Sequence, residues 1–279
     1  MVVDNQATLT YIQVQKEDLA TFRLVPKDGS VPEYKPGQFI TIGMHVPSEN
    51  KIIRRAYSIA SNPENRKYVE LYIRWVRKPL PGRLTTQLFS AKESDEIVWI
   101  KPVGNFTLDD KKADGTEDDR RIVCLGGGTG LAPFVSLAQS LHATRSKREL
   151  IVLHGASYVD ELGYKDLLTD LENESLDRGK DKWNFRYRAT ISRPQEWFNR
   201  SWSGQIGRVE TFLRTKDGES SPLEKLVGGK ITKENTVFFI CGWQGTIDGC
   251  MDYLAPKGFV TERNKRPDKS FEIKYESYG

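Results

Sequence analysis

The sequence predicts an antiparallel β-barrel at the N-terminus and a C-terminal α/β domain built on a parallel sheet. In the first hundred or so residues, short strand candidates are separated by glycine and proline turns, which is typical of a barrel or sandwich. From residue 121 onward, strand and helix candidates alternate, which is typical of a parallel sheet covered by helices. The length of 279 residues suits two domains, and we expect them at residues 1–112 and 113–279.

The expected barrel strands share short length and flanking turn residues, and they lie at 14–24, 37–46, 54–61, 68–76 and 95–104. In GQFITIGMHV (37–46), apolar residues alternate with others at a period of two, as in a half-buried strand. Residues 108–121, LDDKKADGTEDDRR, are polar and charged without an apolar period. We expect this stretch to form an exposed linker or hairpin loop.

The second domain is expected to alternate its elements along the chain. Its strand candidates are 121–125, 149–155, 185–192, 236–242 and 271–278. Its helix candidates are 134–143, 161–172, 208–215 and 247–255. The first helix places Phe134, Leu137, Ala138 and Leu141 on one face, which is the face we expect to be buried.

The composition argues against several classes of protein. With 42 basic and 38 acidic residues, the charge is too balanced for a dedicated nucleic-acid binder. Three cysteines at no metal-binding spacing predict reduced thiols and no metal or iron–sulfur centre. No apolar run reaches the roughly 18 residues of a membrane span, and the first residues lack a signal-peptide pattern. We therefore expect a cytoplasmic protein without membrane insertion. The histidines show no partner pattern, and we interpret His142 and His154 as structural.

A glycine-dense turn follows the strand candidate at 121–125. Gly126, Gly127, Gly128 and Gly130 let the backbone approach a phosphate closely, and the N-terminus of the next helix offers unpaired N–H groups. Pro133 fits the first turn of that helix. The spacing is not the usual G-x-G-x-x-G, and no acidic residue follows at the place that would bind a ribose hydroxyl. By itself the motif fits either a nucleotide site or a tight structural turn.

A second group of candidate ligand-binding residues lies upstream, in RRAYSIAS (54–61). Arg55 and Tyr57 share one face of the expected strand, and Ser58 points to the other. An arginine can bind a diphosphate through paired hydrogen bonds, a tyrosine can stack on a ring system, and a serine can bond a ring nitrogen. In isolation, the stretch also fits an exposed arginine beside a half-buried tyrosine.

R-x-Y-S on a barrel strand, followed by G-T-G-x-A-P after a strand, resembles the ferredoxin–NADP(+) reductase family. The resemblance extends over nearly the whole chain, through ordered motifs at 55–61, 71–75, 82–88, 127–137, 191–197 and 241–254. It implies FAD at the barrel edge and NADP(H) on the second domain.

The resemblance also implies roles for individual residues. Arg55 would hold the FAD diphosphate, Tyr57 would stack on the flavin, and Ser58 would hydrogen-bond near the flavin N5. The FAD-binding set is Arg55, Ala56, Tyr57, Ser58, Tyr72, Ile73, Arg74, Gly82, Leu84 and Thr85. The NADP(H)-binding set is Gly128, Thr129, Gly130, Pro133, Ser192, Arg193, Arg208, Cys241 and Gly242, the last two beside the nicotinamide.

An aromatic residue near the C-terminus often covers the second flavin face in this family. The chain ends FEIKYESYG, and we favour Tyr278 over Tyr275 for this role, although both could simply pack near the last strand. If Tyr278 stacks there, it must move before nicotinamide can react, so it joins Ser58 and Cys241 as a catalytic candidate.

Two arginines, Arg193 and Arg208, could pair with the 2′-phosphate of NADPH. Glu196 lies three residues after Arg193 and could repel that phosphate. Ser157 stands at a position where the resemblance implies an arginine in bacterial relatives, which also argues against NADPH. Plant-type relatives carry a glutamate after the C-G motif. The corresponding position in this sequence is Ile247, next to Asp248. Because the glutamate is absent there, the sequence does not identify the group that would carry a proton to the flavin.

The resemblance implies a FAD-dependent reductase that transfers electrons between NADP(H) and ferredoxin or flavodoxin, by hydride transfer at the flavin. The alternatives are the reductase component of an oxygenase system and a non-catalytic flavin- or nucleotide-sensing subunit. An acidic partner could dock on basic residues near the FAD strands, or these could be a solvated rim: Lys51, Arg54, Arg66, Lys67, Arg77, Lys78 and Arg83. No apolar stripe is left over for a dimer, which favours a monomer.

Overall fold

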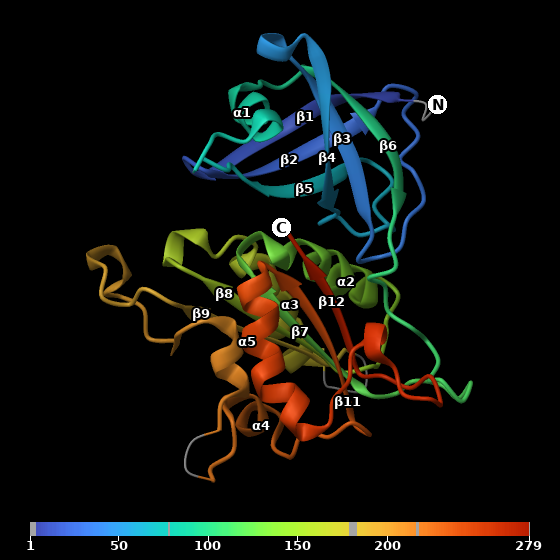
Figure 1. Ribbon diagram of the computed structural model, residues 1–279, viewed down its shortest axis with the longest axis vertical. Coiled ribbons are helices and arrows are strands. Elements are labelled where there is room, and N and C mark those ends of the chain that lie inside the picture. Colours follow the sequence, from blue (N-terminus) through green and yellow to red (C-terminus); the bar gives the residue numbers. More distant parts are fainter. Residues whose placement is uncertain (1–3, 78, 179–182, 216–217, 279) are drawn as a thin grey trace. The chain divides into compact units, whose positions relative to one another are not determined.

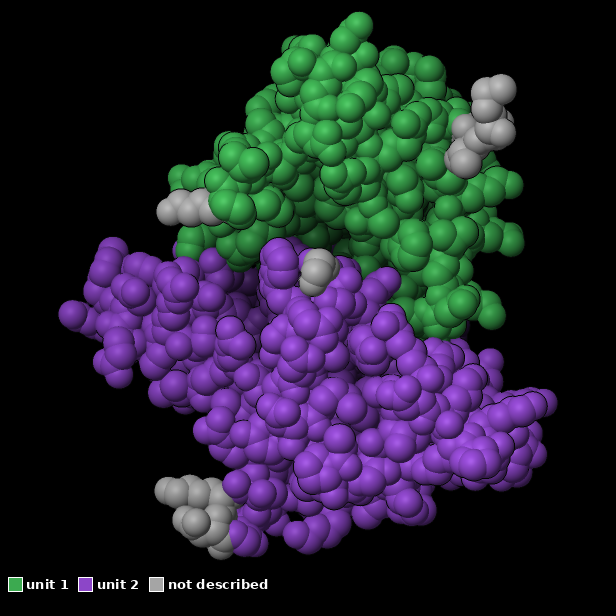
Figure 2. Space-filling model, viewed as in Figure 1, with its two compact units in different colours: residues 1–107, 132–140 green, residues 108–131, 141–279 purple. Residues whose placement is uncertain are grey.

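The computed structural model describes residues 4–77, 79–178, 183–215 and 218–278 (Figure 1). The chain divides into two compact units (Figure 2). The first comprises residues 1–107 and 132–140, and the second comprises residues 108–131 and 141–279. Within the described ranges, no helix is both long and apolar enough to span a membrane.

The first unit is an antiparallel six-stranded sheet in the order β4-β3-β6-β1-β2-β5. Its strands are β1 (Asn5–Lys16), β2 (Leu19–Pro26), β3 (Phe39–Val46), β4 (Lys51–Ser58), β5 (Val69–Arg74) and β6 (Glu96–Val103). An antiparallel bridge between Ile59 and Leu71 joins the chain just after β4 to β5, the opposite edge of the sheet. The sheet therefore curls toward closure, as the expected barrel requires.

Alternating strand residues fill the interior of this barrel. Phe22 and Leu24 on β2 are fully buried together with Ile40 and Ile42 on β3. The helix α1 (Arg83–Ser90) adds Leu88, one helical turn beyond the buried Leu84, to the same core. The family motif at 82–88 therefore comprises the N-cap residue Gly82 and most of α1.

The second unit is a parallel sheet in the order β10-β9-β8-β7-β11-β12 (Figure 1). Its strands are β7 (Arg121–Gly127), β8 (Leu150–Ala156), β9 (Phe185–Ile191), β10 (Gln205–Ile206), β11 (Thr236–Gly242) and β12 (Ile273–Ser277). The helices along this part of the chain are α2 (Ala132–Ala143), α3 (Lys165–Arg178), α4 (Pro222–Val227) and α5 (Gln244–Leu254). Every residue of β8 and β11 is buried, as expected of strands covered on both faces. The predicted fold class is confirmed for both parts.

Three predicted elements were wrong in detail. The strand expected at 14–24 is a hairpin, because Lys16 pairs with Leu19 across a two-residue turn that contains neither glycine nor proline. The helix expected at 208–215 is a 3-10 helix, η5 (Val209–Leu213), whose buried Val209, Phe212 and Leu213 follow a spacing near three. The helix expected from residue 161 begins at Lys165, since Glu161 belongs to the separate 3-10 turn η3 (Val159–Glu161).

One buried histidine ties the stability of the second unit to pH. His154 on β8 is fully buried, and its Nδ1 lies 3.2 Å from the hydroxyl of Tyr187. Burial lowers the pKa of His154 to about 3, and a backbone hydrogen bond at Gly128 acts weakly in the opposite direction. The native state therefore holds this imidazole neutral, as a structural residue.

We predict that His154 makes the second unit acid-sensitive. Below the ordinary histidine pKa of about 6.5, the unfolded chain binds a proton that the native state does not, so stability falls by up to about 1.4 kcal/mol per pH unit toward pH 3. Urea unfolding at several pH values should show a flatter decline for His154→Gln. The exposed His45→Gln is the control and should follow the wild-type profile; identical slopes for all three proteins would contradict the prediction.

Candidate functional site

The glycine turn lies directly against the backbone of the neighbouring strand. In the β7–β11 pairing, Gly126 is opposite Cys241, and the chain then passes through a 3-10 turn, η2 (Gly128–Leu131), into α2. A Cβ on Gly130 would lie 2.3 Å from the carbonyl oxygen of Cys241 and 2.8 Å from the amide nitrogen of Gly242. Only glycine fits at this position, because both neighbouring atoms belong to the backbone.

Two further glycines shape the same turn. A Cβ on Gly127 would lie 2.8 Å from the hydroxyl of Thr246 at the start of α5, and Gly128 adopts a left-handed φ of 56°. The turn follows the carboxyl end of a parallel strand and leads into a helix of 12 residues. The turn fits the diphosphate of a dinucleotide, because its three glycines expose backbone that a phosphate can approach closely.

The last strand brings a carboxylate to Cys241. In the β11–β12 register, Cys241 is opposite Glu276 and Gly242 is opposite Ser277, and the N–H of Tyr278 donates to the Gly242 carbonyl over 2.9 Å. Burial raises the pKa of the Cys241 thiol; the charge of Glu276 raises it further, and a side-chain hydrogen bond with Tyr278 opposes both. The thiol therefore stays protonated, and Cys241 contributes its packing and backbone rather than a thiolate.

The sequence patterns did not reveal Glu276; the position of the family's glutamate corresponded to Ile247, next to Asp248, and the proton route was left open. Ile247 is buried in the core, and Asp248 accepts a hydrogen bond from Gln244 over 2.7 Å on α5. The missed signal was the alternation of the final strand, since Glu276 falls two residues from Tyr278 and opposite Cys241.

The two C-terminal tyrosines differ in their surroundings. Tyr275 pairs with Ile240, packs against the core that includes α5, and has the Arg263 guanidinium 4.5 Å from its ring centroid. Tyr278 lies beyond the end of β12, next to Gly242. Tyr275 is therefore already held in the core of the second unit, whereas Tyr278 lies at the edge that carries the glycine turn.

The two arginines proposed for the 2′-phosphate occupy different surroundings. Arg193 follows β9, is exposed, donates a hydrogen bond to the Tyr158 hydroxyl, and places its guanidinium carbon 5.2 Å from the Tyr158 ring centroid. Arg208 is also exposed, but its guanidinium lies beside Gly245 at the start of α5, 3.6 Å from a Cβ built there. Ser192 is exposed, and its N–H donates to the Ala156 carbonyl over 2.9 Å.

In the first unit, one arginine of the barrel strands differs from its neighbours. Arg54 forms a hydrogen-bonded pair with Asp4 at 3.0 Å, and Arg74 forms an ion pair with Asp18 at 2.8 Å. Arg55 is exposed, its guanidinium donates a hydrogen bond to the Arg54 carbonyl over 2.7 Å, and among the described residues no carboxylate forms an ion pair with it. Arg55 therefore keeps its charge available for an anion such as a diphosphate, whereas Arg74 is already neutralised.

Most of the remaining FAD-binding candidates have buried or half-buried side chains. Tyr57 is half-buried and packs against the barrel core, where burial raises the pKa of its hydroxyl. The side chains of Ser58, Tyr72, Ile73, Leu84 and Thr85 are all buried. A Cβ on Gly82 would lie 2.4 Å from the Thr85 hydroxyl, so a side chain there would displace that hydroxyl where the chain enters α1. The apolar members of this group, Ile73 and Leu84, can offer a ligand only their backbone.

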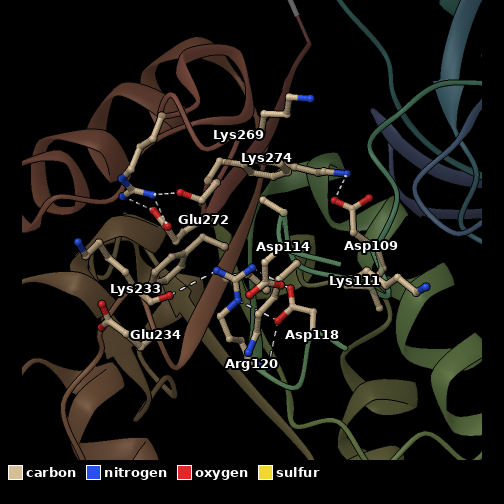
Figure 3. Close-up of a pocket in the computed structure, with 18 of the residues that line it drawn as sticks. Asp109, Lys111, Asp114, Asp118, Arg120, Lys233, Glu234, Lys269, Glu272 and Lys274 are labelled. Atoms are coloured by element: carbon tan, nitrogen blue, oxygen red, sulfur yellow. Dashed lines mark hydrogen bonds and ion pairs between the residues drawn. The ribbon is translucent and has the colours of Figure 1, made fainter. Parts of the chain in front are cut away.

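One cavity of the second unit lies away from this site. It has a volume of about 800 Å³ and is lined by the 109–118 hairpin, Arg120, Lys233, Glu234 and the 266–274 segment (Figure 3). Arg120 precedes β7 and Glu234 precedes β11, so the cavity lies at the amino edge of the sheet, opposite the glycine turn. In it, Asp118 pairs with Arg120 at 2.8 Å, and Lys274 pairs with Asp109 at 2.9 Å.

Comparisons with known families agree with these two units. Residues 6–108 match the oxidoreductase FAD-binding domain, and residues 124–251 match the oxidoreductase NAD-binding domain. A crystal structure of a ferredoxin NADP+ reductase from Neisseria gonorrhoeae with bound FAD and NADP has a TM-score of 0.75 at 22% identity, covering 98% of both chains. At that identity, the likeness shows the fold.

Two curated relatives are informative at the sequence level. The reductase component of propane 2-monooxygenase from Mycolicibacterium goodii is 26% identical over 255 residues, covering 91% of this chain and 64% of that protein. The ferredoxin–NADP reductase of Pseudomonas aeruginosa is 36% identical over 137 residues, covering 49% of each. The chain thus spans between half and two thirds of the length of these relatives. With its FAD-binding and NAD-binding domains, its fold and these relatives, the chain belongs to the ferredoxin–NADP reductase family of oxidoreductases.

Proposed function

We propose that the chain is a FAD-dependent ferredoxin (or flavodoxin)–NADP(+) reductase of the cytoplasm, with a FAD domain at 1–112 and an NADP(H) domain at 113–279. The observation that carries this proposal is the group of residues at the carboxyl edge of β7, β11 and β12. There the glycine turn packs on Cys241 and Gly242, with Glu276 and Tyr278 beside them. The Pseudomonas relative, at 36% identity over half the chain, supports the same assignment.

The bound cofactors supply the redox chemistry: FAD accepts two electrons from a reduced nicotinamide and can release them singly. The chain's own residues bind and orient. Arg55 would hold the FAD diphosphate and Tyr57 would offer a ring face to the flavin. The turn at 128–130 would hold the NADP(H) diphosphate, and Cys241 with Gly242 would form the wall beside the nicotinamide.

Glu276 and Tyr278 complete the proposed chemistry. The Glu276 carboxylate is the charged group next to Cys241, where it can hold or pass a proton at its oxygens. Tyr278 would cover the flavin in the resting enzyme and leave when nicotinamide enters, which makes a gating step.

The proposed docking surface for an acidic carrier is smaller than the sequence suggests. Lys51 and Arg83 share Glu49, at 2.9 and 3.0 Å, and Arg77 pairs with Glu17 at 2.8 Å. Arg66 and Lys67 are exposed and have no carboxylate partner among the described residues; Lys78 lies outside them. An acidic partner would therefore interact most strongly near 66–67.

A second candidate function is the reductase component of an oxygenase. It is favoured by the propane 2-monooxygenase relative, which matches 91% of this chain. Both functions use the same flavin and nucleotide sites, so they differ only in the electron acceptor.

The first test is the visible spectrum of the purified protein, followed by anaerobic reduction. We expect a flavin spectrum that NADPH bleaches faster than NADH. Arg193→Ala should raise the KM for NADPH at least about tenfold, because a charged hydrogen bond to the phosphate is lost, and should leave NADH unaffected. The exposed Arg200→Ala is the matched control. A colourless protein that takes up no FAD would refute the function, and faster bleaching by NADH would refute the nucleotide preference.

Gly130→Ala tests the nucleotide turn. The added methyl would meet the Cys241 carbonyl at 2.3 Å, so the turn must move away from β11. We expect reduction by NADPH to fall at least about tenfold, with FAD content unchanged. Gly229→Ala is the control, since a Cβ there meets nothing within 4 Å. Full activity in Gly130→Ala would show that the turn does not hold the nucleotide.

Glu276→Gln tests the carboxylate that the sequence did not reveal. The change keeps the shape and removes the charge, so we expect kcat to fall at least about tenfold while FAD content and the KM for NADPH stay near wild type. Asp248→Asn, the alternative carboxylate, should leave kcat unchanged. The measurement is steady-state reduction of ferricyanide by NADPH. A larger loss of kcat in Asp248→Asn than in Glu276→Gln would overturn this assignment.

A further inference from the structure

A single buried asparagine joins the two loops that carry Tyr158 and Arg193. Asn199 is 1% exposed and ends the 3-10 turn η4 (Trp197–Asn199) after β9. Its side-chain oxygen accepts the N–H of Val159 over 3.0 Å, and its side-chain amide donates to the Arg193 carbonyl over 2.8 Å. The loop after β8 is therefore fixed to the loop after β9 through one side chain.

The two backbone groups that Asn199 bonds explain why this position carries an asparagine. The Val159 N–H needs an acceptor and the Arg193 carbonyl needs a donor, and an amide side chain supplies both at once. A carboxylate of the same length could accept but not donate, and an apolar side chain could do neither. Because the site is buried, an unpaired backbone group left behind there would also cost stability.

Arg193 is held at both ends by this arrangement. Its backbone is tied to Asn199, and its guanidinium lies against Tyr158, which in turn packs on Phe198 at a ring distance of 5.0 Å. Among the described residues, no carboxylate forms an ion pair with Arg193. The result is an exposed, uncompensated guanidinium with a restricted position, which suits recognition of a phosphate monoester.

We infer that Asn199 is a positioning residue for selection of the 2′-phosphate: it fixes Arg193 and Tyr158 and thereby sets the preference for NADPH over NADH. The inference rests on the proposed function, in which Arg193 binds that phosphate. Asn199 itself does not contact the nucleotide. Its effect passes through Arg193, so it should disappear when Arg193 is absent.

The experiment is a double-mutant cycle on the full FAD-loaded chain, with affinity for 2′,5′-ADP and for ADP measured by calorimetry. We expect Arg193→Ala and Asn199→Ala each to weaken 2′,5′-ADP binding roughly tenfold and to leave ADP unchanged. The double variant should bind 2′,5′-ADP no more weakly than Arg193→Ala alone, because coupled residues are not additive. Asn199→Asp keeps the hydrogen-bond acceptor and loses the donor. Its affinities for 2′,5′-ADP and for ADP should match those of Asn199→Ala.

Controls separate positioning from general damage. Thr190→Val removes another buried hydrogen bond near the same strand end, to the Gly207 carbonyl at 2.8 Å, and should leave both affinities unchanged. FAD content and thermal midpoint check that each variant folds. An unchanged 2′,5′-ADP affinity in Asn199→Ala, an equal loss for ADP, or additive losses in the double variant would each overturn the inference.

The same measurements separate this inference from the proposed function. If the wild-type protein binds 2′,5′-ADP more tightly than ADP and the cycle is non-additive, but NADPH does not reduce the flavin, the reductase function fails and the role of Asn199 stands. If the wild type does not prefer 2′,5′-ADP, the inference fails together with the NADPH preference. A reductase that prefers NADH would then remain.

Discussion

The site depends on a close approach between two stretches of backbone. The turn after β7 lies against Cys241 and Gly242 at the end of β11, and a methyl group on Gly130 would meet the Cys241 carbonyl at 2.3 Å. This contact is possible only because β7 and β11 are parallel neighbours whose carboxyl ends coincide. It places the turn, the start of α5 through Thr246, and the end of β12 within one small region.

Ion pairs with neighbouring carboxylates determine which basic side chains of the two units remain available for a ligand. On the barrel, the basic side chains at 51, 54, 74, 77 and 83 each have a carboxylate partner, with Lys51 and Arg83 sharing Glu49, whereas Arg55 forms no ion pair among the described residues. In the second unit, no carboxylate of the described residues pairs with Arg193, which is held by hydrogen bonds and a ring contact instead. An arginine of this kind suits a phosphate group, because an arginine that is already paired must first give up its carboxylate.

Buried titratable groups near the turn are kept neutral. Burial lowers the pKa of His154 and raises the pKa of Cys241, so neither carries charge at neutral pH. Glu276, beside Cys241, is the ionisable carboxylate in this group. In the proposed function, proton chemistry beside the nicotinamide would use Glu276 rather than the thiol.

The sequence by itself determined the class of each domain, the order of the family motifs, and the glycines that the turn requires. These features are carried by contiguous residues, whose period and turn chemistry act locally. Only the tertiary structure decided that Glu276 rather than Asp248 lies beside Cys241, that Arg54 but not Arg55 pairs with a carboxylate among the described residues, and that Asn199 joins two loops. Each depends on strand register or on partners distant in sequence, such as Asp4 for Arg54 and Val159 for Asn199. Local sequence patterns carry no information on such pairings, because they form only when the strands align and the loops pack.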